Sequence, residues 1–381
     1  MDFEFSDEQR QLRDAVGRYL REQYDFDRYR AIRRTSEGWS REAWRGLAEI
    51  GVLGLTVPAE QGGLGFGPLE TLMALSECGR SLVLEPVLAS AVIATAALRP
   101  FARDGGAAAA ALLSRMSAGE QVAVLAHFES DAGYDGGRVT TCARRAGEVY
   151  RLDGHKGVVM HAPAADALLV SARVSGEPPD SRGVSLFIVP AAARGVSIDA
   201  YPTLDGQRAG DVYLAAVEVP AAARLGAEGE ALPAIESALD AGLAGLCADA
   251  VGAMQALLDA TVEYVKERQQ FGQPIGRFQA LQHRIADMIV SLEQARSMSY
   301  LAALRCESGD LDERRRALSA AKAVVGQSAR YIGQQAIQLH GGMGMTEEMR
   351  ASHWFRRLTA AQILFGDSDW HLQRFAALSR S

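Results

Sequence analysis

The sequence predicts an α+β protein with a helical N-terminal domain, a middle antiparallel β-sandwich or barrel, and a C-terminal four-helix bundle. Apolar residues follow the helical period through the first third of the chain. Near Gly119 the pattern changes to short β-rich runs, and after Pro220 it returns to long helices. The expected domains are therefore residues 1–118, 119–222 and 223–381.

The first third contains several expected helices. Ser6 and Gln9 form the pattern of a capping box, which predicts a helix that begins beside them. A second helix is expected over residues 44–53. The glycine-rich residues 57–67 predict a loop that either lines a ligand mouth or only connects helices. Helical periodicity then continues over residues 69–116.

The middle third is predicted to be all β. Its β-rich runs are residues 122–126, 149–152, 157–161, 167–174, 184–189 and 212–219. Asp153-Gly154, between the second and third runs, is the sharpest hairpin signal. No helical pattern separates the runs, so an antiparallel arrangement is expected.

The last third returns to helices, expected over residues 235–267, 281–307, 311–340 and from about 352 onward. The first of them is apolar on more than one face, which is typical of the central helix of a bundle.

Composition restricts the class of partner. The chain has 381 residues, of which 48% are hydrophobic, enough for sizeable cores. A net charge of -7 without a basic block argues against nucleic acid as a main partner. The arginines at 28, 30, 33 and 34 are interspersed with apolar residues and predict a solvated helix face.

The same composition predicts a cytoplasmic protein. The N-terminal sequence is acidic where a targeting peptide would be basic, and no run reaches the roughly 18 apolar residues of a membrane span. The four cysteines are too far apart for a metal motif and too few for a disulfide framework, so free thiols are expected at Cys78, Cys142, Cys247 and Cys306.

One stretch, residues 264–282, predicts a corner between two long helices. The helical pattern breaks at Phe271-Gly272-Gln273-Pro274 and restarts at Ile275, with Arg268 ending the first helix and Gln279 one turn into the second. A guanidinium beside an amide and an aromatic ring suits a phosphate next to a flat heterocycle. The same pattern also fits a plain helical hairpin with an exposed arginine and a core phenylalanine.

These residues resemble a known family. The run Arg268, Phe271-Gly272, Ile275 and Phe278-Gln279 is similar to the central signature of the acyl-CoA dehydrogenase flavoenzymes. The run from Gln338 to Gly344, followed by Arg356, resembles that family's C-terminal signature, at a spacing that also fits. Weaker similarities at residues 57–65 and 206–208 extend the resemblance over nearly the whole chain.

The resemblance implies FAD as cofactor, an acyl-CoA substrate and an oligomer. In the family, the matching positions reach across a subunit interface to the pyrophosphate and adenine end of a neighbour's FAD. The cofactor-binding positions implied here are Arg268, Phe271, Phe278, Gln279, Gln338, Gly341 and Gly342. Gly341-Gly342 is also the pattern of a helix C-cap after His340.

The family's base is absent from its usual positions. Dehydrogenation of an acyl-CoA requires a carboxylate to remove the α-proton and a flavin to accept the β-hydride. Carried over from Gln338 and Arg356, the usual glutamate position is Phe365, which cannot accept a proton. The alternative position on the long central helix lies in the segment 241–245, which has no carboxylate; the nearest is Asp240. Leu243 stands where many members carry an arginine.

The strands expected to face the flavin also depart from the family pattern. Residues 126–131 match the run where the family has a Thr-Glu-Pro-Gly element. Val158 stands where a flavin-packing tryptophan is usual, and Met160 where a hydroxyl donor is usual. His127 and His161 could replace some polar anchoring, although a lone histidine beside a strand is more often structural.

The departures favour a subunit that supports a partner's site. The chain resembles the small, non-catalytic subunit of heteromeric acyl-CoA dehydrogenases, in which a related catalytic chain supplies the base. One alternative is a self-sufficient enzyme, such as a homotetramer, that uses Asp367 as base. Another is a different flavin-dependent oxidation, or a binding protein, on the same fold. Electron-transfer flavoprotein is a further expected partner.

Overall fold

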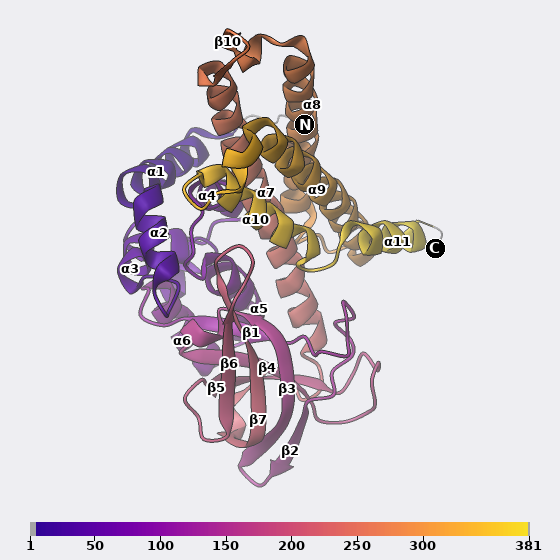
Figure 1. Ribbon diagram of the computed structural model, residues 1–381. Helices are drawn as coiled ribbons and strands as arrows, with labels where there is room; N and C mark the ends of the chain where they lie inside the picture. Colours follow the sequence, from indigo (N-terminus) through magenta and orange to yellow (C-terminus); the bar gives the residue numbers. More distant parts are fainter. Residues whose placement is uncertain (1–4, 380–381) are drawn as a thin grey trace. The chain divides into compact units, whose positions relative to one another are not determined.

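The computed structural model describes residues 5–379 and confirms the helical, β, helical order (Figure 1). The chain folds into two compact units. The first combines the chain up to Ala31, Pro68–Val83 and everything from Leu243 onward. The second consists of Ile32–Gly67 and Leu84–Gly242.

The first unit is a helical bundle. Its helices are α1 (Asp7–Gln23), α4 (Pro68–Ser81), most of α7 (Leu232–Glu267), α8 (Gln279–Arg305), α9 (Leu311–His340), α10 (Arg350–Ile363) and α11 (Ser368–Leu378). The expected capping box of α1 is present, with Ser6 accepting from Gln9 N. The helix expected from about residue 352 is in fact two helices, because the chain turns sharply at Phe365-Gly366.

Two glycines allow α4 and α7 to pack backbone against backbone. A Cβ on Gly79 would lie 1.9 Å from the carbonyl oxygen of Asp249, and one on Gly252 would lie 1.8 Å from that of Ser76. No side chain fits at those distances, so each helix contributes one glycine to the close approach.

Helix α7 corrects one expectation from the sequence. Among residues 5–379 it is a helix long and apolar enough to cross a membrane, although no run of that length was expected. Of its most apolar 18-residue window, however, 89% is buried inside the fold. That burial is what a helix apolar on all sides requires at the centre of a bundle.

The second unit begins with helical segments. They are the end of α2 (Phe26–Arg34), α3 (Arg41–Glu49), η1 (Val52–Gly54), η2 (Ala59–Gln61), the π-helix η3 (Val87–Ala94), α5 (Thr95–Arg103) and α6 (Ala107–Ser117). The loop 57–67 folds back on its own start, since Gly65 N donates to Val57 O and Phe66 N to Leu55 O. Its glycines therefore serve the local turn.

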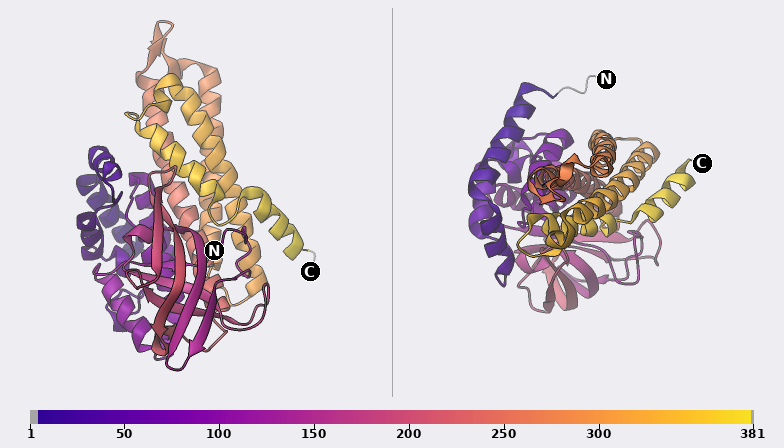
Figure 2. Two further views of the ribbon diagram at one scale, coloured as in Figure 1. Left: turned by 60° about the horizontal axis from the view of Figure 1, so that its bottom comes forward. Right: turned by 45° about the horizontal axis from the view of Figure 1, so that its top comes forward.

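An eight-stranded mixed sheet forms the rest of the second unit, and its long strands β3 and β7 run side by side (Figure 2). The strands are β1 (Ala123–Ala126), β2 (Cys142–Ala146), β3 (Val149–Met160), β4 (Ala167–Arg173), β5 (Val184–Pro190), β6 (Val196–Pro202), β7 (Arg208–Pro220) and β8 (Arg224–Leu225). The order is β6-β7-β3-β2-β4-β5-β8, with β1 paired to β4. Because β4 pairs in parallel with β1 and β2, the sheet is not purely antiparallel as expected.

The hairpin expected at Asp153-Gly154 is wrong. Both residues lie inside β3, where the register with β7 shifts between Leu152 and Gly154. Asp153 accepts a hydrogen bond from Ala216 N across that bulge. Asp and Gly serve bulges as well as turns, so local sequence alone did not distinguish them. The real turn is Gly147-Glu148, between β2 and β3.

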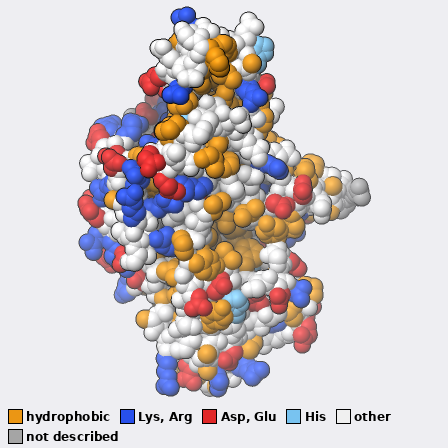
Figure 3. All heavy atoms as spheres, viewed as in Figure 1, with side chains coloured by type: hydrophobic (Ala, Val, Ile, Leu, Met, Phe, Trp, Pro, Cys, Tyr) orange, Lys and Arg blue, Asp and Glu red, His pale blue; other side chains and the backbone are white. Residues whose placement is uncertain are grey.

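The surface shows no large patch of a single charge in the view of Figure 3, where basic and acidic side chains are interspersed over the N-terminal helices. Arg30 of α2, one of the four clustered arginines, pairs with Asp27 on the same helix. The four cysteines are free thiols, as expected.

Candidate functional site

The predicted corner contains a small β-hairpin. Helix α7 ends at Glu267, β9 (Gln269–Gln270) pairs with β10 (Gln273–Pro274), and α8 begins at Gln279. Ile275 therefore lies in the short helix η6 (Ile275–Arg277) and does not restart the long helix as expected. Phe271 and Gly272 both have positive φ, which is the two-residue turn geometry that matches the twist of a hairpin.

The side chains of this hairpin point into solvent. Phe271 is 89% exposed, and Arg268 and Gln279 are also exposed. The rings of Phe271 and Phe278 meet edge to face, with centroids 6.0 Å apart. Apart from this edge contact, the ring of Phe271 is exposed and accessible to a ligand or to another chain. The alternative of a core phenylalanine is thereby excluded for Phe271.

The second signature, residues 338–344, contacts the end of α7 just before this hairpin. Tyr264, one turn before Arg268, donates from its hydroxyl to the carbonyl oxygen of His340, 3.2 Å away. The two rings stack with centroids 4.4 Å apart. His340 is the last residue of α9, and burial lowers its pKa and so favours the neutral ring. The end of α7 is thus tied to the end of α9 (Figure 1).

Beyond His340 the backbone is open. Gly341 caps α9 with φ +60, as the sequence pattern predicted, and starts η7 (Gly341–Met345). A Cβ on Gly272, Gly341 or Gly342 would meet nothing within 4 Å. Gln338 is also exposed. Open backbone beside a guanidinium and an amide permits close approach of an anionic ligand.

The turn that holds Phe365 is built differently. Phe365 has φ +58, a conformation that costs a non-glycine residue about 1–3 kcal/mol and needs support from its surroundings. Lys322 on α9 is 1% exposed and donates to the carbonyl oxygens of Gly366 at 2.6 Å and Gln362 at 3.0 Å. His371 Nε2 donates to the carbonyl oxygen of Phe365 at 3.0 Å.

Electrostatics around this turn reflect burial. Burial lowers the pKa of Lys322 to about 8, while Cys247 and Asp367 raise it. Burial also raises the pKa of Cys247 to about 12 and lowers that of His371 to about 4. The thiol and the imidazole are therefore neutral near pH 7, and Lys322 serves as a donor of hydrogen bonds to the turn.

Asp367 has a structural role. It is the N-cap of α11, and its carboxylate accepts from Trp370 N at 2.8 Å. Its carboxylate therefore satisfies one of the free N–H groups in the first turn of that helix. In the central helix, Leu243 and Ala244 are buried, and Asp240 is buried with an interaction partner.

The two histidines lie directly after strand ends, His127 after β1 and His161 after β3, and both contact neighbouring polar groups. His127 is buried, and its Nδ1 lies 2.9 Å from Ser171 Oγ. Burial lowers the pKa of His127 to about 3, with Lys156 adding to the effect. His161 Nε2 pairs with Gln207 at 2.9 Å. Neither replaces the hydroxyl donor missing at Met160.

Val158 departs from the family pattern in an exposed place. It is 59% exposed with φ +51, and its N–H donates to Asp211 Oδ1 at 2.9 Å. Its side chain offers neither a broad ring face nor a hydrogen-bond donor. A flavin ring would find no polar side-chain anchor at Val158 or Met160.

One buried ion pair in the sheet was missed by the sequence analysis. Lys156 Nζ lies 2.7 Å from Glu129 Oε1 and also donates to Ser171 Oγ and His127 O. Burial raises the pKa of Glu129, but Lys156, Thr140 and Thr141 outweigh it and hold that pKa at about 2. The sequence did contain an indication of this pair: Lys156 directly precedes the β-rich run 157–161. A charged side chain that becomes buried in a sheet must be paired.

Comparison with known proteins identifies the class. Residues 6–120, 125–217 and 230–378 match the family descriptions "Acyl-CoA dehydrogenase, N-terminal domain", "middle domain" and "C-terminal domain". Mitochondrial isovaleryl-CoA dehydrogenase of Pongo abelii is 31% identical and covers 96% of this chain and 86% of its own length. L-prolyl-(peptidyl-carrier protein) dehydrogenase of Pseudomonas fluorescens is 31% identical and covers 97% of each chain.

A solved structure gives the same answer. The ChsE4-ChsE5 complex from Mycobacterium tuberculosis matches with a TM-score of 0.87 and 25% identity, over 100% of this chain and 99% of that one. Fold and sequence together define an FAD-dependent oxidoreductase. The chain belongs to the acyl-CoA dehydrogenase family, whose members dehydrogenate acyl thioesters.

The residues present fit one end of FAD better than the other. The exposed Arg268, Gln279 and Gln338, with open backbone at Gly341-Gly342, offer donors for a pyrophosphate. Bound FAD supplies the hydride acceptor of the family's reaction. At the ring end, Val158 and Met160 supply no polar contact.

Proposed function

We propose that this chain is the FAD-associated, non-catalytic subunit of an acyl-CoA dehydrogenase assembly, in which a related chain supplies the carboxylate base. The observation that carries the proposal is the turn at Phe365. Its backbone is held by Lys322 and His371, and its side chain cannot accept a proton.

Neither of the two other candidate segments supplies a base in place of residue 365. Asp367 caps α11, and the segment 241–245 of α7 is apolar. A general base must reach the α-proton of the thioester within hydrogen-bonding distance, and neither segment offers a free carboxylate. The self-sufficient alternative therefore has no supporting contact.

Exposed residues support a role across an interface. Phe271 is almost fully exposed, and its neighbours Arg268 and Gln279 lie at the same end of the bundle. Such residues fit a cofactor held mainly by another chain. The solved relative is described as a complex of two differently named chains, which makes a heteromer a reasonable arrangement for this chain too.

The substrate is proposed at the level of an acyl thioester. One relative is named for an acyl-CoA and another for a prolyl group on a peptidyl-carrier protein. A test should therefore offer both carriers. The departures from the family pattern at Val158 and Met160 do not indicate which of the two carriers, coenzyme A or a carrier protein, holds the acyl group.

The experiment measures FAD per chain and acyl-thioester turnover, for the chain alone and after co-expression with family members that retain a glutamate base. We expect activity only in the mixture, with about one FAD per pair of unlike chains. A matched control replaces the partner's glutamate with glutamine and should abolish the activity of the mixture. Brisk turnover and one FAD per chain in a purified homo-oligomer would overturn the proposal. Turnover only with a small non-thioester substrate would favour another flavin reaction.

A further inference from the structure

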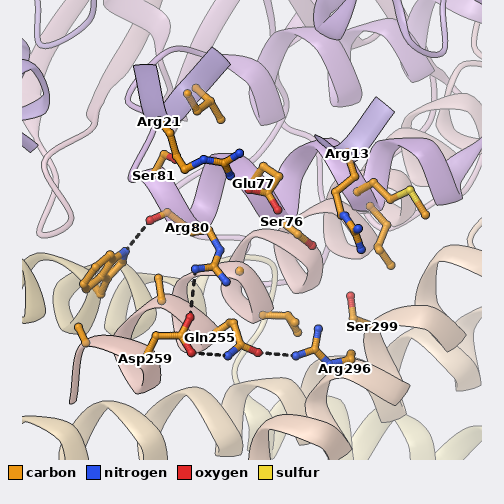
Figure 4. Close-up of a pocket in the computed structure, with 18 of the residues that line it drawn as sticks. Arg13, Arg21, Ser76, Glu77, Arg80, Ser81, Gln255, Asp259, Arg296 and Ser299 are labelled. Carbon is orange, nitrogen blue, oxygen red and sulfur yellow. Dashed lines mark hydrogen bonds and ion pairs between the residues drawn. The ribbon is translucent and has the colours of Figure 1, made fainter. Parts of the chain in front are cut away.

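A cavity lies entirely within the first unit and is lined by residues outside the two signatures. Its volume is about 820 Å³, within the range of small-molecule sites. Its walls come from α1, α4, α7, α8 and α10, and Figure 4 shows the polar side chains that point into it. None of these residues belongs to the predicted cofactor-binding set.

Apolar side chains line much of the cavity. Leu20, Tyr24, Met73, Val251 and Trp354 are all buried and all line it. Such a lining favours the apolar part of a ligand, because binding removes apolar surface of both from water.

Arginines dominate the charged part of the lining. They are Arg13, Arg21, Arg80, Arg296 and Arg350, against the carboxylates Asp25, Glu77, Asp259 and Glu263. Three of the four carboxylates are already engaged. Asp259 bonds Arg80 and Gln255, Glu263 bonds Lys266, and Asp25 accepts from Arg28 N.

Glu77, the remaining carboxylate, is set among arginines. Burial raises its pKa, while Arg80, Arg21 and Arg13 lower it. Its position in Figure 4 lies between Arg21 and Arg13. The five arginines outnumber the four carboxylates of the lining. Arg13 and Arg296 also pair with Asp14 and Glu293 beside it, and an anion would be a further acceptor for their remaining donors.

Two buried polar atoms of the lining have no hydrogen-bond partner among the described residues. Ser299 is 2% exposed, and its Oγ is unpaired. Arg350 Nε is also unpaired, although the guanidinium stacks over Trp354 at 4.7 Å and Phe26 at 5.8 Å. Buried unpaired groups cost about 1–3 kcal/mol each and are rare without a reason.

Ser299 lies in the more basic end of the cavity. Figure 4 shows Arg13, Arg296 and Ser299 on the same side of the cavity, and burial raises the pKa of the neighbouring Tyr300, which both arginines lower. Arg296 also donates to Gln255 Oε1 at 2.6 Å. A hydroxyl and two guanidinium groups from α1 and α8 therefore face the same end.

We propose that this cavity binds a small organic anion, with its carboxylate or phosphate group at Arg13, Arg296 and Ser299 and its apolar body along Met73 and Val251. The unpaired Ser299 hydroxyl becomes hydrogen-bonded when the anion is present. The proposal is independent of the proposed function, since it uses no residue of that site.

The test uses three probes with the same six-carbon body: hexanoate, hexyl phosphate and 1-hexanol. Calorimetric titration of the full chain in its isolated assembly should show saturable binding of at least one anion at about 1 mM or tighter, and weaker binding of hexanol. A preference between the two anions assigns the head group. Equal binding of hexanol, or no saturable binding of either anion, overturns the proposal.

Three variants locate the binding. Arg296→Met should weaken the anion about ten- to a hundredfold by removing a charge-assisted contact. Ser299→Ala should weaken it about two- to tenfold, yet leave the melting temperature of the ligand-free protein unchanged or higher, because the hydroxyl is unpaired there. Arg18→Met, an exposed site on α1 outside the cavity, is the control and should leave binding unchanged. Binding that Arg296→Met and Ser299→Ala leave intact would place the anion elsewhere and refute the site.

Discussion

The protein contains two Phe-Gly turns with the same backbone hand and opposite surroundings. Phe271-Gly272 has φ values of +55 and +79, and Phe365-Gly366 has +58 and +106. A Cβ on Gly272 would meet nothing within 4 Å, whereas one on Gly366 would lie 2.7 Å from Trp370 and 2.8 Å from His371. The first turn is open to a neighbour, and the second is enclosed by its own fold.

The difference shows how similar local geometry can serve different purposes. At Phe271 the strained backbone presents a ring that the chain itself leaves exposed, and under the proposed function its burial comes from assembly or ligand binding. At Phe365 internal hydrogen bonds stabilise the strained backbone. The enclosed turn has a phenylalanine and no acid at position 365, and the following predictions test that contrast.

The largest expected effect concerns the enclosed turn. Positioned general bases contribute roughly 100- to 10,000-fold, so the chain alone should be slower than the mixed assembly by at least that factor. Phe365→Glu alone should not restore turnover, because Val158 and Met160 still lack polar contacts for the flavin ring. The rate of flavin reduction by substrate, followed by stopped flow, is measured for the chain alone, for Phe365→Glu and for the mixed assembly. Rescue to within tenfold of the mixed assembly would show that only the carboxylate was missing.

The open turn should matter for cofactor affinity. Arg268→Ala should weaken FAD binding by the assembly about ten- to a hundredfold, since a bidentate, charge-assisted contact contributes about 1.5–3 kcal/mol. Arg277→Ala, an exposed neighbour in η6, is the matched control. The affinities are measured by titrating each FAD-free assembly with FAD and following the FAD fluorescence. Equal retention in both variants would remove Arg268 from the cofactor site.

Lys322 should matter for stability. Lys322→Met leaves the carbonyls of Gln362 and Gly366 without their donor and should lower the free energy of unfolding by about 1–3 kcal/mol at pH 7. Lys266→Met, an exposed lysine paired with Glu263, should change it by less than about 1 kcal/mol. Urea unfolding compares the two. A similarly small loss of unfolding free energy in both variants would mean that the turn does not depend on the hydrogen bonds from Lys322.

Lys322 also predicts a pH dependence. Burial lowers its pKa to about 8 from the ordinary value of 10.5, so the unfolded chain binds more protons between these values. The cost of burying the charge is fully present below pH 8 and is relieved as pH rises toward 10.5. The stability of the wild type relative to Lys322→Met should therefore increase by on the order of 1–2 kcal/mol from about pH 7 to about pH 9.5. A flat or falling difference would contradict the burial effect.

The smallest effect is expected at Asp367. Asparagine caps a helix about as well as aspartate, so Asp367→Asn should change stability by less than about 0.5 kcal/mol and leave the activity of the assembly nearly intact. Steady-state turnover of the assembly is the measurement. A loss of several orders of magnitude would restore the self-sufficient enzyme.

Some features were readable from residues alone because they depend on neighbours in sequence. The capping box at Ser6, the ends of α9 and the change of period near Gly119 and Pro220 are of this kind. The family signatures around Arg268 and Gln338 identified the fold class. Asp and Gly occur both in hairpin turns and in β-bulges, so the local pattern at Asp153-Gly154 predicted the wrong one. The pairing of β3 with β7 determines that these residues form a bulge.

The sequence by itself determined which chemical groups this chain has: an arginine, amides and glycines for a cofactor's polar end, and no acid at Phe365. Only the tertiary structure decided which groups meet. It brought Tyr264 to His340, placed Lys322 under Gly366 and Lys156 beside Glu129, and assigned Asp367 to a helix cap. Apart from the Asp367 cap, those contacts join residues far apart in the chain, and burial affects their strength. Neither partner's position can be derived from its local sequence, because packing of whole helices and strands fixes it.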